Sequence, residues 1–230
     1  MSIMAFLLTL PAVNSMLIME MKAALFDLDG VIVNTEPLYT DFWQEVGKEY
    51  FPEDESFAKK LKGQTLNNIL STYFGSDEKI RQEIRKRLDA FESQMDFPLI
   101  NGVESFLSQL KAAGIPAAVV TSSDRFKMQR LEKKCPKLMV GFDSVFTAED
   151  ALRSKPAPDC YISAAHALGF EPEDCCVFED SVNGLRAARA SGAFVVGLTT
   201  SFPEDVVGEM SDITVQDFSN MKISDINIKK

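Results

Sequence analysis

Histidine and cysteine are scarce in this sequence. Its 230 residues contain one histidine, four cysteines without Cys-x-x-Cys spacing, and no Gly-x-Ser-x-Gly segment. These absences exclude a metal centre built from several histidines and the usual setting of a serine nucleophile. The cysteine pattern is typical of free thiols, so we expect a reducing, cytoplasmic compartment. We interpret His166, in the helical segment SAAHALGF, as a packing or surface residue.

A net positive charge and an apolar run long enough to span a bilayer are also absent. The formal net charge of −10 argues against a nucleic-acid partner, because phosphate backbones are bound by clustered Lys and Arg. The first twenty residues are apolar, but Pro11 and Asn14 interrupt them and no basic start of a secretory signal precedes them. We interpret residues 1–20 as an extension outside the fold, with a weak signal peptide as the alternative. We expect a monomer without a membrane partner.

Apolar runs alternate with helical patterns along most of the chain. The runs lie in KAALF, at Ile115–Val120, at Cys175–Phe178 and in GAFVVGLTT, and helical patterns over 103–113, 158–168 and 181–191 separate them. This alternation predicts an α/β fold with a doubly wound parallel sheet, a Rossmann-like core. In such sheets the reactive crevice lies at the carboxyl ends of the strands.

One interval interrupts the alternation. Between Asn34 and Leu99 the sequence shows amphipathic helical patterns, in EPLYTDFWQEVGKEY, QTLNNILSTYF and EKIRQEIRKRLDAFESQM. This stretch is too long for a simple crossover between two strands. We therefore expect an α/β core of residues 21–34 and 100–230, with a helical cap of residues 35–99 inserted over the crevice.

Two carboxylates follow the first apolar run. Asp27 and Asp29 stand two positions apart in FDLDGV, so their side chains point into the same crevice. Both stay ionised only with help from a divalent cation or a lysine, and otherwise one of them carries a proton. The pair thus offers a nucleophile and a general acid, although an acidic turn after a strand is the ordinary alternative. Gly30 allows the chain to turn sharply behind them.

Three further polar clusters follow the later runs. Thr121 and Ser122 end the second run and suit an anionic oxygen. Lys155, in SKPAPDCY, would hold an adjacent aspartate ionised and neutralise phosphate charge. Glu179 and Asp180 offer the hard oxygen ligands that magnesium prefers. Each cluster alone also fits an ordinary role, namely a helix cap, a solvated lysine or an acidic helix start.

Together, in this order, the four clusters resemble the motifs of the haloacid dehalogenase superfamily. The matching segments are DLDGV at 27–31, Thr121 after VV, Lys155 in KPAPD, and FEDS around Glu179 and Asp180. DGVIVNTEP, LKGQT, SKPAPD and EDSVNGLRAA are similar to segments of the beta-phosphoglucomutase-like phosphatases with a helical cap. The resemblance extends from Met21 to about Ser219.

The resemblance implies a phosphatase that hydrolyses a small, sugar-phosphate-like monoester through an aspartyl phosphate. Asp27 would attack phosphorus, and Asp29 would protonate the leaving oxygen and then activate water. Thr121 and Lys155 would hold the phosphoryl oxygens, with Ser122 beside them.

The resemblance also implies a magnesium site and sets this chain apart from the dehalogenases. Asp27, the backbone carbonyl of Asp29 and Asp180 would bind Mg²⁺, supported by Glu179. An acid at Asp29 favours phosphate esters over carbon–halogen bonds, because an alkoxide leaving group needs a proton and a halide does not.

Cap residues separate a phosphatase from the alternative, a phosphosugar mutase. Leu66 stands where the resembling mutases carry an arginine, and Tyr39 where they carry a histidine. Both differences remove groups suited to a second phosphate and favour the phosphatase. A binding module that has lost the chemistry is a further alternative. Substrate contacts are expected from the hinge and the cap, at Thr35, Glu36, Tyr39, Lys62, Gly63, Gln64 and Thr65.

Overall fold

A six-stranded parallel sheet forms the centre of the protein. The computed structural model describes residues 18–19, 21–61, 64, 66–226 and 228–229. The strand order is β4-β3-β2-β5-β6-β7, and every neighbouring pair is parallel. The strands are β2 (Ala23–Phe26), β3 (Ala117–Val120), β4 (Ser144–Phe146), β5 (Cys175–Glu179), β6 (Phe194–Leu198) and β7 (Ile213–Val215). The predicted α/β fold with a parallel sheet is thus confirmed.

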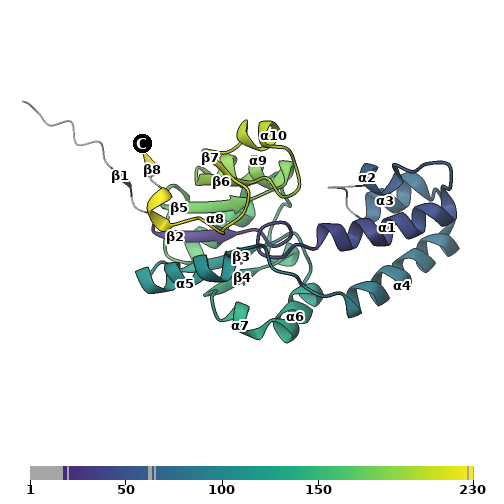
Figure 1. The fold of residues 1–230 in the computed structure, drawn as a ribbon, viewed down its shortest axis with the longest axis horizontal. Coiled ribbons are helices and arrows are strands. Elements are labelled where there is room, and N and C mark those ends of the chain that lie inside the picture. Colours follow the sequence, from purple (N-terminus) through teal and green to yellow (C-terminus); the bar gives the residue numbers. More distant parts are fainter. Residues whose placement is uncertain (1–17, 20, 62–63, 65, 227, 230) are drawn as a thin grey trace, which may run out of the picture.

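Helices cover both faces of this sheet (Figure 1). One face packs against α5 (Val103–Ala113), α6 (Arg125–Lys134) and α7 (Pro136–Met139), and the other against α8 (Asp159–Ala167) and α9 (Val182–Ser191). The shorter elements are α10 (Glu204–Gly208), η1 (Ala148–Asp150), η2 (Pro172–Asp174) and η3 (Ile223–Asp225). A separate antiparallel pair joins β1 (Ile18–Met19) to β8 (Ile228–Lys229).

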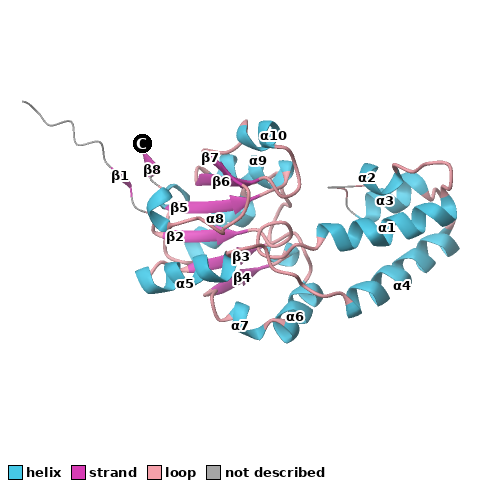
Figure 2. Ribbon diagram, viewed as in Figure 1, coloured by secondary structure: helices cyan, strands magenta, loops and turns pink. Residues whose placement is uncertain are grey.

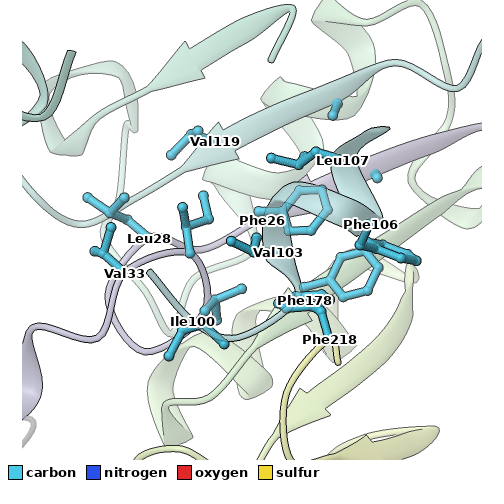
Figure 3. Close-up of a cluster of buried hydrophobic side chains, with 14 of the residues drawn as sticks. Phe26, Leu28, Val33, Ile100, Val103, Phe106, Leu107, Val119, Phe178 and Phe218 are labelled. Atoms are coloured by element: carbon cyan, nitrogen blue, oxygen red, sulfur yellow. The ribbon is translucent and has the colours of Figure 1, made fainter. Parts of the chain in front are cut away.

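The central strands are apolar on both faces, as burial on both sides requires. Along β2, Ala24 and Phe26 belong to one hydrophobic cluster, and Ala23 and Leu25 to the other. Phe26 stacks on Phe178 of β5 with ring centroids 4.4 Å apart. Figure 3 shows this pair beside Phe106 and Phe218 on the side of α5. These aromatic rings anchor β2 and β5, whose ends carry two of the polar clusters.

Four of the five described helices between β2 and β3 lie apart from the sheet. They are α1 (Glu36–Tyr50), α2 (Phe57–Lys60), α3 (Leu66–Tyr73) and α4 (Glu78–Gln94), and the word cap refers to them below. Figure 2 shows the arrowheads of the sheet facing this group. The cap has its own apolar cluster, which includes Trp43, Phe57, Leu70 and Ile84. The exact boundary at residues 35 and 99 stays a prediction.

The segments that enter and leave the cap are bonded side by side. Val33 bridges Leu99, and the amide of Asn34 donates to the carbonyl of Pro98 at 2.7 Å. The cap therefore begins and ends at one place beside the carboxyl edge of the sheet. None of the helices in the described residues is long and apolar enough to span a bilayer.

The first part of the chain falls largely outside the described residues. The extension predicted for residues 1–20 is described only at Ile18–Met19. Two strands of the six-stranded sheet, β4 and β7, were missing from the sequence prediction, as was the separate pair of β1 and β8. β4 and β7 lie at the edges of the sheet and are only partly buried, so neither has the continuous apolar run of the central strands.

Candidate active site

The sheet brings the polar clusters together at its carboxyl edge. Asp27 follows β2, Thr121 follows β3, and Glu179 and Asp180 lie at the end of β5. A cleft of about 710 Å³ between this edge and the cap is lined by Asp27, Thr121, Asp180 and Lys155. Glu179 lies buried behind the cleft. The cleft is also lined by Asp29, predicted to be catalytic, and by Ser122, predicted to bind phosphate. Four of the predicted substrate contacts line it as well, namely Thr35, Glu36, Tyr39 and Gln64. Lys62, Gly63 and Thr65 lie outside the described residues.

Lys155 joins two of the carboxylates. Its ammonium lies 2.5 Å from Asp27 Oδ1 and 2.8 Å from Glu179 Oε1, and it also donates to the carbonyl of Val120. Burial raises the pKa of Asp27 to about 7, with the charges of Glu179 and Asp29 adding to the effect and Lys155 opposing it. Burial alone would lower the pKa of Lys155, but Asp27 and Glu179 hold it well above its ordinary value. Lys155 therefore stays a cation at the carboxylate expected to be the nucleophile.

Glu179 is fixed by protein donors on both oxygens. Oε1 accepts from Lys155 and the Tyr161 hydroxyl, while Oε2 accepts from the amides of Asp180 and Ser181 at 2.8 Å each. The first turn of α9 makes room for this carboxylate through Gly184, where a Cβ would lie 1.6 Å from Oε1. With its oxygens engaged, Glu179 suits a supporting role better than direct metal binding. Gly184 and Tyr161 were missed in the sequence, where both pass as ordinary helix residues.

Asp180 completes an acidic cluster. Oxygens of Asp27, Glu179 and Asp180 lie within 4.8 Å of one another, and all three residues are buried. Burial raises the pKa of Asp180 well above its ordinary value, and the charges of Glu179 and Asp27 add to this effect. Only one ammonium, that of Lys155, bonds to these three carboxylates within the described residues. A buried excess of negative charge on hard oxygen donors fits a divalent cation such as Mg²⁺.

Gly30 allows Asp180 to approach the first motif. Its φ is +79°, and a Cβ at this position would lie 1.9 Å from Asp180 Oδ2. The loop after β6 holds the same carboxylate through the hydroxyls of Thr200, at 3.2 Å, and Ser201. Thr200 also donates to the carbonyl of Gly30 at 2.6 Å. The glycine of the first motif is thus required for close approach as well as for its turn.

Asp29 is bound to a lysine that the sequence interpretation did not include. The ammonium of Lys127 lies 2.7 Å from each carboxylate oxygen of Asp29. The hydroxyl of Thr35 donates to Oδ1, and that of Ser123 to Oδ2 at 3.0 Å. Burial works to raise the pKa of Asp29, but Lys127 and these hydrogen bonds outweigh it and lower the pKa. Lys127 lies in the charged helix sequence RFKMQRLEKK, which resembles a solvated surface and gave no signal.

The cap reaches this ion pair through Tyr39. The ring of Tyr39 lies 5.0 Å from the ammonium of Lys127, and its hydroxyl donates to Glu92 at 2.9 Å. Glu92 in turn accepts from Arg130 of α6 at 2.8 Å. Burial raises the pKa of Tyr39, as do the charges of Asp29 and Glu92, so the hydroxyl remains a donor. Tyr39, predicted as a substrate contact, thus also contacts the catalytic edge of the core.

Thr121 does not cap the helix that follows it. That helix, α6, is capped by Asp124, whose side chain accepts from the amide of Lys127 at 2.8 Å. Thr121 is buried, and its hydroxyl oxygen accepts from the amide of Ser123 at 3.0 Å. Its proton has no acceptor among the described residues, so it can bond an oxygen in the cleft, as the predicted phosphate contact requires.

The chain belongs to the haloacid dehalogenase-like hydrolases, whose family model matches residues 21–192. It is 30% identical over 206 residues to validoxylamine A 7'-phosphate phosphatase of Streptomyces hygroscopicus subsp. limoneus, covering 87% of this chain and 96% of the relative. It is 28% identical to the beta-phosphoglucomutase of Bacillus subtilis (strain 168), covering 85% and 93%. A haloacid dehalogenase hydrolase of family IA, variant 3, from Entamoeba histolytica superposes with a TM-score of 0.77 at 27% identity, covering 89% and 96%. The resemblance inferred from the motifs is confirmed.

Proposed function

We propose that this hydrolase is a magnesium-dependent phosphatase that removes phosphate from a small, sugar-like monoester. The observation that carries the proposal is the buried contact of Lys155 with Asp27 at 2.5 Å, in an acidic cluster at the cleft. Phosphoryl transfer depends on positioning and on neutralisation of negative charge. An ammonium and a divalent cation beside one carboxylate provide both. The similarity to validoxylamine A 7'-phosphate phosphatase supports the same reaction.

Asp27 is the nucleophile in this proposal. One of its oxygens forms a bond to phosphorus while the ester bond to the leaving oxygen breaks. Asp29, a carboxylate in the substrate-free protein, takes up a proton when the anionic substrate binds beside it and delivers that proton to the leaving oxygen. Water then attacks the aspartyl phosphate, Asp29 takes up its proton, and inorganic phosphate leaves with Asp27 restored. Lys155 and Thr121 hold the phosphoryl oxygens. The contact of Lys155 with Asp27, and the place of Thr121 after the neighbouring strand β3 in the same cleft, support these roles.

Asp27, Asp180 and the backbone carbonyl of Asp29 would hold the Mg²⁺, with Glu179 orienting its neighbours. When bound, Mg²⁺ supplies positive charge that neutralises the phosphoryl oxygens and the carboxylates. The raised pKa values of Asp27 and Asp180 support this assignment, since both carboxylates lack sufficient positive charge around them.

The substrate is bound between two unlike surfaces. The core wall is the side of the cleft formed by the strand-end residues just described. The cap wall is the opposite side, formed by the lining residues of α1–α4 and of the segment between α2 and α3. Its apolar part is formed by Trp43, Ala58, Leu61, Leu66, Ile69 and Leu88, and its polar part by Glu36, Tyr39, Thr40, Gln64 and Glu92. Lys155, on the core wall, is the one Lys or Arg among the described lining residues. Leu66 and Tyr39, which line this wall in place of the arginine and histidine of the resembling mutases, favour a substrate without a second phosphate, and so a phosphatase over a mutase.

Free thiols support a cytoplasmic location for the enzyme. All four cysteines are unpaired, and three of them, Cys160, Cys175 and Cys176, are buried. Burial raises the pKa of Cys175 to about 12, so this thiol is held in its unreactive form.

Phosphate release from a panel of monoesters tests the proposal. Purified protein should release phosphate from sugar and polyol monophosphates with Mg²⁺ and lose this activity when a chelator is added. Bisphosphates should be poorer substrates, and no isomerised sugar phosphate should form. A folded protein that hydrolyses no ester in the panel would refute the proposal and leave a binding role.

A further inference from the structure

We infer that Lys127 is a positioning residue for Asp29 and that the cap holds it in place through Tyr39. The inference rests on the proposed function, since it concerns the residue that would deliver the proton to the leaving group. Lys127 lies on core helix α6, its side chain is 8% exposed, and its ammonium contacts both oxygens of Asp29. A lysine this buried needs a fixed partner, and Asp29 is that partner.

The geometry restrains the orientation of Asp29. Its side chain is 30% exposed and follows a short strand, so the backbone alone leaves its carboxylate free to rotate. Thr35 contacts one oxygen and Ser123 the other, while Lys127 contacts both. Lys127 is therefore the group that fixes the plane of the carboxylate, and its charge makes these bonds stronger than those of the hydroxyls.

The cap secures the lysine from the other side. The Tyr39 ring lies 5.0 Å from the ammonium, and the Tyr39 hydroxyl is held by Glu92. Arg130, three positions after Lys127 on α6, binds the other oxygen of Glu92. One face of α6 thus contacts two cap helices, α1 and α4, through charged and aromatic groups. The position of the cap is thereby communicated to Asp29 through a short series of direct contacts.

Leaving-group dependence separates this role from simple support of the fold. The test compares kcat/KM for phenyl phosphate, whose leaving group needs a proton, with kcat/KM for 4-nitrophenyl phosphate, whose leaving group departs with little help. This parameter reports steps up to the transfer of phosphate to Asp27. In Lys127→Met, kcat/KM for phenyl phosphate should fall about 30-fold, because part of the rate enhancement from general acid catalysis is lost. For 4-nitrophenyl phosphate, kcat/KM should fall about threefold or less.

Matched variants complete the design. Lys127→Arg keeps the charge and should recover most of the loss with phenyl phosphate, whereas Lys133→Met, on the exposed last turn of α6, should behave as wild type. Equal losses on both esters in Lys127→Met, or no loss on phenyl phosphate, would overturn the inference. Should Lys127→Met fail to fold, Lys127→Gln and Lys127→Arg are judged by the same ratio. Wild-type protein that cleaves neither ester would instead refute the proposed function.

The contribution of the cap has its own comparison. Tyr39→Leu removes the ring beside the ammonium, and Tyr39→Phe keeps the ring but removes the bond to Glu92. The leucine variant should show the selective loss on phenyl phosphate, at about tenfold, and the phenylalanine variant a smaller one. An unchanged ratio between the two esters in Tyr39→Leu would show that the cap does not act through Lys127.

Discussion

The core wall and the cap wall of the cleft differ in how their side chains are held. On the core wall, Asp27, Glu179 and Asp180 stand at the ends of adjacent strands and are at most 8% exposed. Their oxygens accept bonds from Lys155, from backbone amides and from hydroxyls. On the cap wall six of the eleven described lining side chains are apolar, and five of these six belong to the cluster of the cap, which is separate from the sheet.

This difference assigns separate tasks to the two walls. A sheet edge fixed by hydrogen bonds can hold charges at the distances that phosphoryl transfer demands. An apolar wall on a separate group of helices is free to vary in shape without disturbing those charges. Changes on the core wall should therefore abolish chemistry, and changes on the apolar part of the cap wall should alter the choice of ester.

The largest effect is expected from Asp27→Asn. The amide cannot form the aspartyl phosphate, so kcat should fall by about 10⁴-fold or more on every ester tested. Steady-state phosphate release checks this, with Asp89→Asn, at an exposed position on α4, as the matched control. Thermal unfolding shows whether the variant is folded. Near-normal turnover by folded Asp27→Asn would mean that another group is the nucleophile.

A smaller but still uniform loss is expected from Gly184→Ala. The added methyl would collide with Glu179 Oε1, so the carboxylate that orients Lys155 must move. We expect kcat to fall about 100-fold on all esters and stability to fall by about 2 kcal/mol. Gly208→Ala is the control, because a Cβ there meets only Thr214 Cγ2 at 3.8 Å. If Gly184→Ala keeps full activity, the position of Glu179 is less critical than its contacts indicate.

On the cap wall, Leu66→Arg should change specificity and leave the chemistry intact. Leu66 lines the cleft and is partly exposed, so an arginine there can reach a second anionic group on the substrate. The KM for a sugar bisphosphate should fall about tenfold, while kcat on 4-nitrophenyl phosphate changes little. Leu66→Met controls for shape. A parallel collapse on both substrates would place this residue in the catalytic machinery and weaken the contrast between the two walls.

The smallest effect concerns stability and pH. The pKa of Asp27 in the folded protein is about 7 against an ordinary 3.8, so the folded state binds more protons than the unfolded state between these values. Metal-free stability should accordingly decrease as pH rises through this window. Mg²⁺ replaces the missing positive charge, so it should raise Tm by about 3 °C or more at pH 8 and by less at pH 5.

Asp180→Asn serves as the control for this measurement. It removes one of the repelling carboxylates, so Tm without metal should rise while the increment with Mg²⁺ is lost. Calorimetry at the two pH values checks both effects. An equal Mg²⁺ increment in wild type and Asp180→Asn would place the cation elsewhere.

The sequence predicted the core wall well because its information is local. Asp27, Thr121 and Asp180 each follow an apolar run directly, and parallel strands necessarily bring such positions to one edge. The helices over 36–50 and 103–113 were predicted to the residue, since their apolar periodicity is strong. The family resemblance then ordered these positions into one reaction.

What the sequence did not reveal depends on contacts between distant segments. Lys127 and Asp29 are 98 positions apart, and their pairing results from packing α6 against the loop after β2. Glu92 and Arg130 meet only because the cap returns over α6. In the sequence, Gly184 indicates only a residue that weakens a helix. The fold shows that the Glu179 carboxylate lies where a side chain at this position would be. Such pairings leave no periodicity to read.

The bridge between Val33 and Leu99 has a consequence for how such enzymes diversify. Because the chain leaves the sheet and returns to it at one point, everything between these residues is topologically a detachable module. Replacing it with a shorter or longer segment changes the closure entropy only slightly, since that cost grows with the logarithm of length. The catalytic edge can thus be inherited unchanged while whole caps are exchanged, and a graft between relatives at this junction should carry substrate preference with it.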